Sequence, residues 1–280
     1  SPAPRIGFVV TDMAMAHDRD AGQSVRVQRW GCDASDRLFY IHGLQSHGGW
    51  LFETGAELAS RGVCVEVLDR PGSGLPRVPL PSSSGDLLNL YQRWLTETEV
   101  AGRRTVVGQS MGASVLAALV AERRVPEDFT IVLCAPALGQ QRGRHTAAEL
   151  DHFRGLSGPE LMPVTLRDED YTSLPEYLRW MANDAGMLRA ITADFRRIMV
   201  ELEDRILAAG SHPWQDRSVF VAVPAQDRIV NPFVAAQFLE ALAPSAERTI
   251  LATSDHYIEF SSARGAYWDW LARICTKGRP

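Results

Sequence analysis

Short runs of β-branched and aliphatic residues alternate with helical patterns through most of this chain. Because each crossover between parallel strands needs a connection such as a helix, this alternation favours a parallel sheet covered by helices. Two early runs, separated by Asp18, Asp20 and Gly22, predict an N-terminal hairpin. The sequence therefore predicts an α/β fold with a mostly parallel central sheet and helices on both faces. The expected strands are residues 6–11, 24–30, 38–42, 63–68, 105–108, 129–133, 219–223 and 248–252, and the expected helices are 50–60, 86–98, 111–123, 233–242 and 267–275.

The alternation stops between residues 139 and 212, where no run is typical of a strand. A segment of this length is too long for an ordinary loop. We therefore expect residues 1–138 and 213–280 to form one core and residues 139–212 to form an inserted helical cap. The clearest pattern in the cap is an apolar stripe at helical spacing, formed by Leu188, Ile191, Phe195, Met199, Leu202 and Ile206.

Charge and hydropathy exclude several classes of partner. The formal net charge is −5, with acidic and basic residues mixed along the chain. No long basic stretch offers a binding surface for nucleic acid or an anionic membrane. No apolar run reaches the ~18 residues that span a bilayer, and the first residues lack the pattern of a secretion signal. We expect a cytoplasmic protein without stable membrane insertion, and the oligomeric state stays open.

The sequence carries no cofactor or metal motif. HExxH is absent, and the scattered histidines and cysteines lack the spacing of a zinc site. Gly72 and Gly74 do not complete a dinucleotide-binding fingerprint, and there is no phosphate-binding P-loop. We therefore expect a protein that works without a cofactor or a metal.

The segment Gly108-Gln109-Ser110-Met111-Gly112 matches G-x-S-x-G. An apolar run precedes it and a helix of small residues follows it, which is the strand–turn–helix context of a nucleophile elbow. In that turn the serine oxygen stands at the carboxyl edge of the sheet, where open α/β sheets bind ligands. Ser110 is therefore the predicted nucleophile.

A nucleophilic serine that attacks a carbonyl needs two backbone N–H groups to stabilise the oxyanion that forms. Met111, the residue after the serine, supplies one of them. The other is expected from the turn after strand 38–42, with Leu44 as the first choice and Gln45 as the second. His42 is expected to hold that turn, and His47 either lines the pocket or is simply exposed.

An acid and a base follow two later strands. Asp227 comes after the run 219–223, and His256 comes after the run 248–252. The order Ser, Asp, His is that of the hydrolase triad in this kind of fold. A neutral imidazole accepts the serine proton, and a buried carboxylate holds the imidazole in the right tautomer. Asp255 adjoins His256 too closely in sequence to orient its ring, and Glu259 is a candidate brace for the histidine loop.

Three motifs resemble those of the α/β-hydrolases, closest to the branch of monoacylglycerol lipases and lysophospholipases that is also grouped with the serine aminopeptidases. Residues 42–48 resemble the HGxxxH loop of that branch, residues 108–112 resemble GHSMG, and residues 227–230 resemble D-x-[IV]-V. The resemblance implies a Ser110–Asp227–His256 triad and an oxyanion hole from Leu44 and Met111. Gln109 stands where the branch usually has histidine, which leaves the substrate open.

The favoured function is hydrolysis of a carboxylic ester of a mainly apolar, small-molecule or lipid-like substrate, through an acyl-enzyme on Ser110. The same triad also serves thioesterases, lactone-processing enzymes, acyl transferases and enzymes that eliminate a carboxylate. A ligand-binding receptor that kept the fold is the alternative from another class. The candidate pocket residues are Gln45, His47, Gln109 and, from the cap, Trp180.

Overall fold

A computed structural model describes residues 7–14 and 24–276 of the chain. Within these ranges, eight strands form one sheet in the order β1-β2-β4-β3-β5-β6-β9-β10. β1 and β2 pair antiparallel, as do β2 and β4, and the remaining neighbours are parallel. The strands are β1 (Phe8–Ala14), β2 (Ser24–Trp30), β3 (Arg37–Ile41), β4 (Cys64–Leu68), β5 (Arg104–Gln109), β6 (Phe129–Cys134), β9 (Val219–Pro224) and β10 (Glu247–Leu251).

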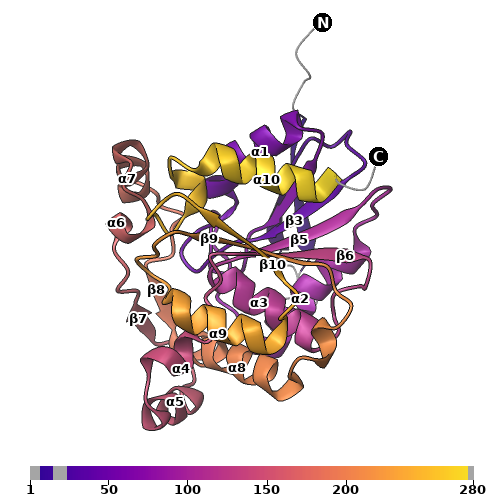
Figure 1. The fold of residues 1–280 in the computed structure, drawn as a ribbon. Helices are drawn as coiled ribbons and strands as arrows, with labels where there is room; N and C mark the ends of the chain where they lie inside the picture. Colours follow the sequence, from indigo (N-terminus) through magenta and orange to yellow (C-terminus); the bar gives the residue numbers. More distant parts are fainter. Residues whose placement is uncertain (1–6, 15–23, 277–280) are drawn as a thin grey trace, which may run out of the picture.

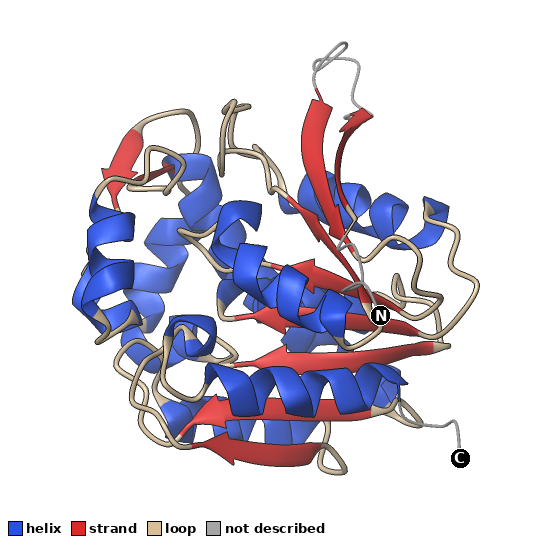
Figure 2. Ribbon diagram, turned by 90° about the horizontal axis from the view of Figure 1, so that it is seen from above, coloured by secondary structure: helices blue, strands red, loops and turns tan. Residues whose placement is uncertain are grey.

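Helices cover both faces of this sheet, so the predicted fold class is confirmed (Figures 1 and 2). One apolar cluster joins a sheet face to α2, α3 and α8, and a second joins the opposite face to α1 and α10. Consecutive residues of β5 enter opposite clusters, Val106 the first and Val107 the second, as side chains alternate along a strand. The helices of the core are α1 (Phe52–Ser60), α2 (Ser84–Glu97), α3 (Met111–Ala121), α9 (Pro232–Leu242) and α10 (Arg264–Thr276).

The N-terminal hairpin is confirmed by the antiparallel pairing of β1 with β2. The expected first strand began at Ile6, which lies outside the described residues. Asp18, Asp20 and Gly22, which suggested the turn, also lie outside them.

Between β6 and β9 the chain forms a mainly helical segment, seen at the left and bottom of Figure 1. The expectation that it contains no strand is wrong, because β7 and β8 pair antiparallel there. Each strand has three residues, too few to give a readable alternation. Ile191 lies in β8, so the apolar stripe is helical only from α8 onward. The elements are α4 (Gln140–Arg144), α5 (Ala147–Arg154), β7 (Leu161–Pro163), α6 (Asp168–Tyr171), α7 (Pro175–Ala182), β8 (Ala190–Thr192) and α8 (Ala193–Ala209).

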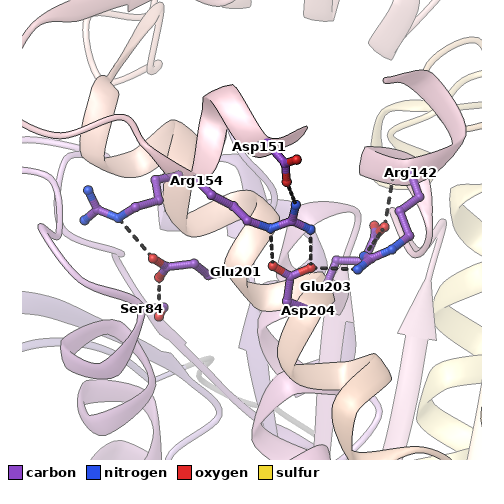
Figure 3. A network of polar contacts seen from close by, with 8 residues as sticks. Ser84, Arg142, Asp151, Arg154, Glu201, Glu203 and Asp204 are labelled. Carbon is purple, nitrogen blue, oxygen red and sulfur yellow. Dashed lines mark hydrogen bonds and ion pairs between the residues drawn. The ribbon is translucent and has the colours of Figure 1, made fainter. Parts of the chain in front are cut away.

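Carboxylates of α8 hold the neighbouring helices in place (Figure 3). Glu203 accepts hydrogen bonds from the backbone N–H groups of Gln141 and Arg142, both at 3.1 Å, at the start of α4. Asp204 pairs with the guanidinium of Arg142 at 2.7 Å and with that of Arg154, from α5, at 2.8 Å. These contacts bring α4 and α5 against α8, and they give both arginines a carboxylate partner.

Across residues 7–14 and 24–276, no helix combines the length and the apolar character needed to cross a membrane.

Candidate active site

Ser110 lies in the turn between β5 and α3, with φ 55° and ψ −118°. A non-glycine residue at such angles is strained by about 1–3 kcal/mol, so its surroundings must hold it there. The Ser110 N–H donates to the Cys134 carbonyl at 2.9 Å, and the Ala137 N–H donates to the Ser110 carbonyl at 3.1 Å. The turn is thus tied to the end of β6, and it leaves the serine side chain at the carboxyl edge of the sheet.

The two glycines of the turn are required by close backbone approaches. A Cβ atom on Gly112 would lie 2.1 Å from the carbonyl oxygen of Ile41 in β3. A Cβ atom on Gly108 would lie 2.7 Å from the Cα atom of Ala113. Because backbone atoms rather than flexible side chains occupy this space, an added methyl group cannot be accommodated without moving α3 relative to the sheet.

We expect Gly112→Ala to lower the free energy of unfolding by about 3 kcal/mol, since it overpacks a close contact between a helix and the sheet. Urea denaturation followed by circular dichroism measures the change. Gly265→Ala is the matched control: it lies in α10 with no heavy atom within 4 Å of an added Cβ. Alanine is favoured over glycine inside a helix, so this control should be neutral or slightly stabilising. Equal stability of the two variants would contradict the packing argument.

The structure brings together the three residues of the predicted triad. Asp227 follows β9 and His256 follows β10, and these strands are parallel neighbours. The His256 Nε2 atom lies 2.8 Å from the Ser110 Oγ atom. The His256 Nδ1 atom lies 2.9 Å from each carboxylate oxygen of Asp227. The side chain of His256 is fully buried and that of Asp227 is 3% exposed, so the hydrogen bonds between these two side chains are shielded from water.

Asp227 is held in its ionised form by its partners. Burial alone would raise the pKa of this carboxyl group, but the charge and hydrogen bond of His256 and the backbone N–H groups of Ile229 and Val230 lower it below its ordinary value. Both N–H groups donate to Oδ1 at 2.8 Å. An ionised carboxylate can only accept from Nδ1, so the imidazole carries its proton there and leaves Nε2 free to accept from Ser110.

The turn after β3 lies against the nucleophile. Leu44 lines the same cavity as Ser110 and Met111. Met111 begins α3, and the first N–H groups of a helix have no partner within it. The structure therefore places both residues predicted for the oxyanion hole beside the serine. His42 ties this turn to the residues after β4, since its Nε2 atom accepts the Arg70 backbone N–H at 3.0 Å.

Arg70, which the sequence analysis did not single out, fixes the direction of this turn. Its guanidinium is fully buried and donates to the carbonyl oxygens of Gly43, at 3.0 Å, and Leu44. In a trans peptide the C=O and N–H groups point in opposite directions. With the Gly43 carbonyl turned toward Arg70, the N–H of Leu44 is directed to the other side of that peptide plane. Nothing in the sequence marks this role, because it depends on where β4 ends beside β3.

A cavity of about 270 Å³ adjoins Ser110. Among the described residues that line it, none is acidic, and most are apolar. Two arginines, Arg144 and Arg196, also line it, together with His145. The sequence analysis did not identify these three, since the end of α4, the residue that follows it and α8 bring them together from positions far apart in the chain. The apolar part of the wall includes Leu44, Met111, Val164, Leu166, Ile191, Met199, Leu202, Ile229 and Val230.

The four predicted pocket residues do not line this cavity. The amide of Gln45 is used elsewhere, accepting from the Tyr171 hydroxyl at 2.8 Å and donating to the Leu188 carbonyl at 2.8 Å. Gln109 is 1% exposed and lies behind the turn at Gly43.

His47 and Trp180 line a separate depression on the other side of the turn. There the Nε2 atom of His47 lies 2.9 Å from a carboxylate oxygen of Asp184, which also accepts the Trp50 indole N–H at 2.8 Å. Through Asp184, the side chains of His47 and Trp50 therefore connect the β3–α1 turn to the segment after α7.

Glu259 lies three residues after His256 but does not contact it directly. Its carboxyl group accepts a hydrogen bond from the Tyr40 hydroxyl, which lies 3.1 Å from the Tyr267 hydroxyl. The second carboxyl oxygen is buried without a partner among the described residues. Burial raises the pKa of Glu259 to about 8, so this side chain is largely protonated in the folded protein at neutral pH.

We expect Glu259→Gln to flatten the decline of stability between pH 5 and pH 8. The folded state keeps a proton that the unfolded chain releases near its ordinary pKa of 4.5, so wild-type stability falls as the pH rises through this window. The loss is on the order of 3 kcal/mol. Glutamine has no proton to release, so the variant should lose less stability than the wild type. Urea unfolding at both pH values measures the difference, and parallel pH profiles would contradict it.

One family of known proteins matches most of this chain. The family described as "Serine aminopeptidase, S33" matches residues 33–260. A search of curated proteins by sequence finds no match.

Solved structures share the fold at low identity. The monoacylglycerol lipase of Paleococcus ferrophilus has a TM-score of 0.76 at 14% identity, covering 90% of this chain and 98% of its own. A soluble variant of the monoglyceride lipase of Saccharomyces cerevisiae has a TM-score of 0.75 at 13% identity, covering 99% of each chain. The thioesterase domain from the curacin biosynthetic pathway has a TM-score of 0.67 at 17% identity, covering 95% and 99%. Because the family match extends over most of the sequence, the chain belongs to the serine aminopeptidase S33 family, and it is a hydrolase with the α/β-hydrolase fold.

Proposed function

We propose that this hydrolase cleaves a carboxylic ester through an acyl-enzyme on Ser110, with His256 as general base and Asp227 as the acid that orients it. The observation that carries the proposal is the continuous set of hydrogen bonds from the Ser110 Oγ atom to His256 Nε2, at 2.8 Å, and from Nδ1 to Asp227, at 2.9 Å. These distances lie within the reach that proton transfer requires.

In the first half of the reaction, the Ser110 Oγ atom bonds to the ester carbonyl carbon while its proton passes to His256 Nε2. The bond between this carbon and the alcohol oxygen then breaks, and His256 returns the proton to the leaving alcohol. In the second half, a water molecule gives its proton to His256 and attacks the acyl-enzyme. Collapse of this second intermediate breaks the bond between the acyl carbon and the Ser110 Oγ atom and releases the acid, while His256 returns its proton to Oγ and so restores Ser110. Asp227 stabilises the imidazolium in both halves without taking its proton.

Negative charge develops on the carbonyl oxygen at each attack, and the N–H groups of Leu44 and Met111 are the proposed donors to it. Two observations support this: both residues border the cavity at Ser110, and Arg70 holds the carbonyl that precedes the Leu44 N–H. Each such donor contributes about 3–4 kcal/mol to stabilisation of the transition state.

Residues 139–212 act as a cap over this site in our proposal. Members of α4, β7, α6, β8 and α8 line the cavity together with Ser110, and the segment lies on the side toward which the parallel strands point (Figure 2). The predominantly apolar wall supports a substrate whose acyl or alcohol part is largely hydrocarbon.

A series of p-nitrophenyl esters of rising acyl length tests this function. We expect hydrolysis of the short members, and labelling of Ser110 by a fluorophosphonate probe. Added alcohols or thiols reveal acyl transfer if the product ester or thioester replaces the free acid. Absence of both hydrolysis and labelling would overturn the proposal.

A further inference from the structure

Arg144 and Arg196 line the cavity beside Ser110 and have no carboxylate partner within 4 Å in the parts of the chain that the structure describes. Two neighbouring arginines do form ion pairs. Arg142 pairs with Glu203 and Asp204, and Arg154 pairs with Asp204, as Figure 3 shows. The two cavity arginines therefore differ from Arg142, on the same helix as Arg144, and from Arg154, on α5, which both have carboxylate partners.

Neutral groups hold these two side chains in position. Arg196 donates to the side-chain oxygen of Gln141 at 2.7 Å, and its other terminal nitrogen lies 3.0 Å from His145 Nε2. Its guanidinium also lies 3.9 Å from the centre of the Phe153 ring. Arg144 donates to the backbone carbonyl of Ile229, in the loop that carries Asp227. These contacts orient the guanidinium groups through neutral partners. The carboxylate of Asp227, which is hydrogen-bonded to His256, acts on the charge of Arg144 only from beyond ion-pair distance.

The electrostatic surroundings favour an anion at this wall. Burial is the main cause that lowers the pKa of Arg196, and repulsion from Arg144 is the second. Burial and then the charge of Arg196 lower the pKa of His145, while the Glu149 carboxylate, 4.0 Å away, opposes them. The lowered pKa favours the neutral imidazole, which can accept from Arg196. No acidic side chain lines the described cavity, and Asp227 is engaged by His256. Two like charges placed together in a partly buried site gain stability from a bound anion.

We propose that Arg144 and Arg196 form a binding site for an oxyanion, a carboxylate or a phosphonate-like group, at the end of the substrate remote from the scissile ester. This inference rests on the proposed function, and it narrows the substrate to a small ester with an apolar middle and one anionic end. The cavity volume of about 270 Å³ limits its size, because drug-sized ligands occupy pockets of about 300–1,000 Å³. The guanidinium group of arginine donates two parallel N–H groups to an oxyanion. It therefore fits this role better than the single point charge of a lysine ammonium group.

Binding is tested first, in the Ser110→Ala protein, so that the ligand is not consumed. Isothermal titration calorimetry compares monomethyl glutarate, which carries one carboxylate, with the neutral dimethyl glutarate. We expect the monoanion to bind at least tenfold more tightly, and we expect Arg196→Gln or Arg144→Gln in the same background to remove most of that preference. Equal binding of the two ligands, or a preference that survives both substitutions, would overturn the site.

Arg197→Gln is the matched control. Arg197 is the next residue on α8 and is paired with Asp194 at 2.8 Å and Glu201 at 3.0 Å, and it does not line the cavity. The Arg197→Gln substitution removes one positive charge from the same helix as Arg196, and the variant should keep the preference for the monoanion. If it abolishes the preference as strongly as Arg196→Gln does, the effect comes from net charge and the proposed site is wrong.

Hydrolysis by the wild-type enzyme separates this inference from the proposed function. We expect kcat/KM for the mono-p-nitrophenyl ester of glutaric acid to exceed that for p-nitrophenyl pentanoate, of similar length, at least tenfold. A phosphonate-ended ester of equal length shows which oxyanion the site favours. Equal rates for the charged and neutral esters would refute the oxyanion site while leaving the esterase function intact. Selective binding without hydrolysis of any ester would support the site and refute the function.

Discussion

Ser110→Ala is expected to lower kcat for ester hydrolysis by about 10⁶-fold, because no other group near His256 replaces the nucleophile. The structure predicts little change in stability, since alanine fits the space of serine and shares its strained backbone angles, φ 55° and ψ −118°. Initial rates with a p-nitrophenyl ester measure the loss, and fluorophosphonate labelling should disappear with it.

Ser114→Ala is the matched control for this variant. Ser114 lies one turn further along α3, lines the same cavity and donates to the Ala137 carbonyl at 3.1 Å. Its removal costs a hydrogen bond but leaves the hydrogen bonds among the triad, so kcat should stay within about tenfold of wild type. A Ser110→Ala enzyme that retains more than about 1% of wild-type kcat would contradict the covalent mechanism.

The triad residues act as one unit, so their losses should not add. His256→Ala removes the acceptor for the serine proton and is expected to cost about as much as Ser110→Ala. Once either residue is absent, the other has no remaining role in proton transfer. The double variant should therefore be no slower than the single ones, and a further large loss in the double variant would show that the two side chains work independently.

Much of the fold and of the triad could be predicted because their signals are local. The elbow at Ser110 is an apolar run, a glycine turn and a helix, all within a few consecutive residues. Asp227 and His256 each follow a strand directly, and the carboxyl ends of parallel strands meet at one edge of the sheet. Sequence order and strand direction thus bring these side chains to one edge before any packing detail is known.

The wall of the cavity could not be predicted, because it depends on how separate elements pack. Arg144 and Arg196 line one cavity because α4 packs against α8, where Glu203 accepts backbone N–H groups of α4, and no local pattern encodes that contact. Gln45 follows the right turn for a pocket residue, yet its amide is taken up by Tyr171 and Leu188. Acidic and basic residues are mixed throughout residues 139–212, so the sequence does not show which arginines have a carboxylate partner. The three-dimensional arrangement does.

The role of the Asp227 carboxylate leads to the second prediction with a large expected effect. We expect Asp227→Asn to lower kcat by about 10⁴-fold with nearly unchanged stability. The asparagine oxygen can still accept the N–H groups of Ile229 and Val230 that now reach Oδ1, so the loop keeps its shape. The amide NH₂ group then faces His256 Nδ1 and donates to it. That contact stabilises the tautomer with its proton on Nε2, which cannot accept the proton of Ser110.

Asp255→Asn is the control that separates this tautomer effect from a general loss of negative charge near the histidine. Asp255 is 2% exposed and adjoins His256 in sequence, but its carboxylate accepts from the Ser173 hydroxyl at 3.0 Å and lies 3.7 Å from Arg228. Both substitutions neutralise a buried carboxylate, one bound to the imidazole and one on the residue before it in the sequence, yet only Asp227 touches Nδ1. We therefore expect kcat of Asp255→Asn to remain within about tenfold of wild type, whereas Asp227→Asn loses about 10⁴-fold. Comparable losses in the two variants would mean that field strength at the imidazole, rather than its tautomer, governs the reaction.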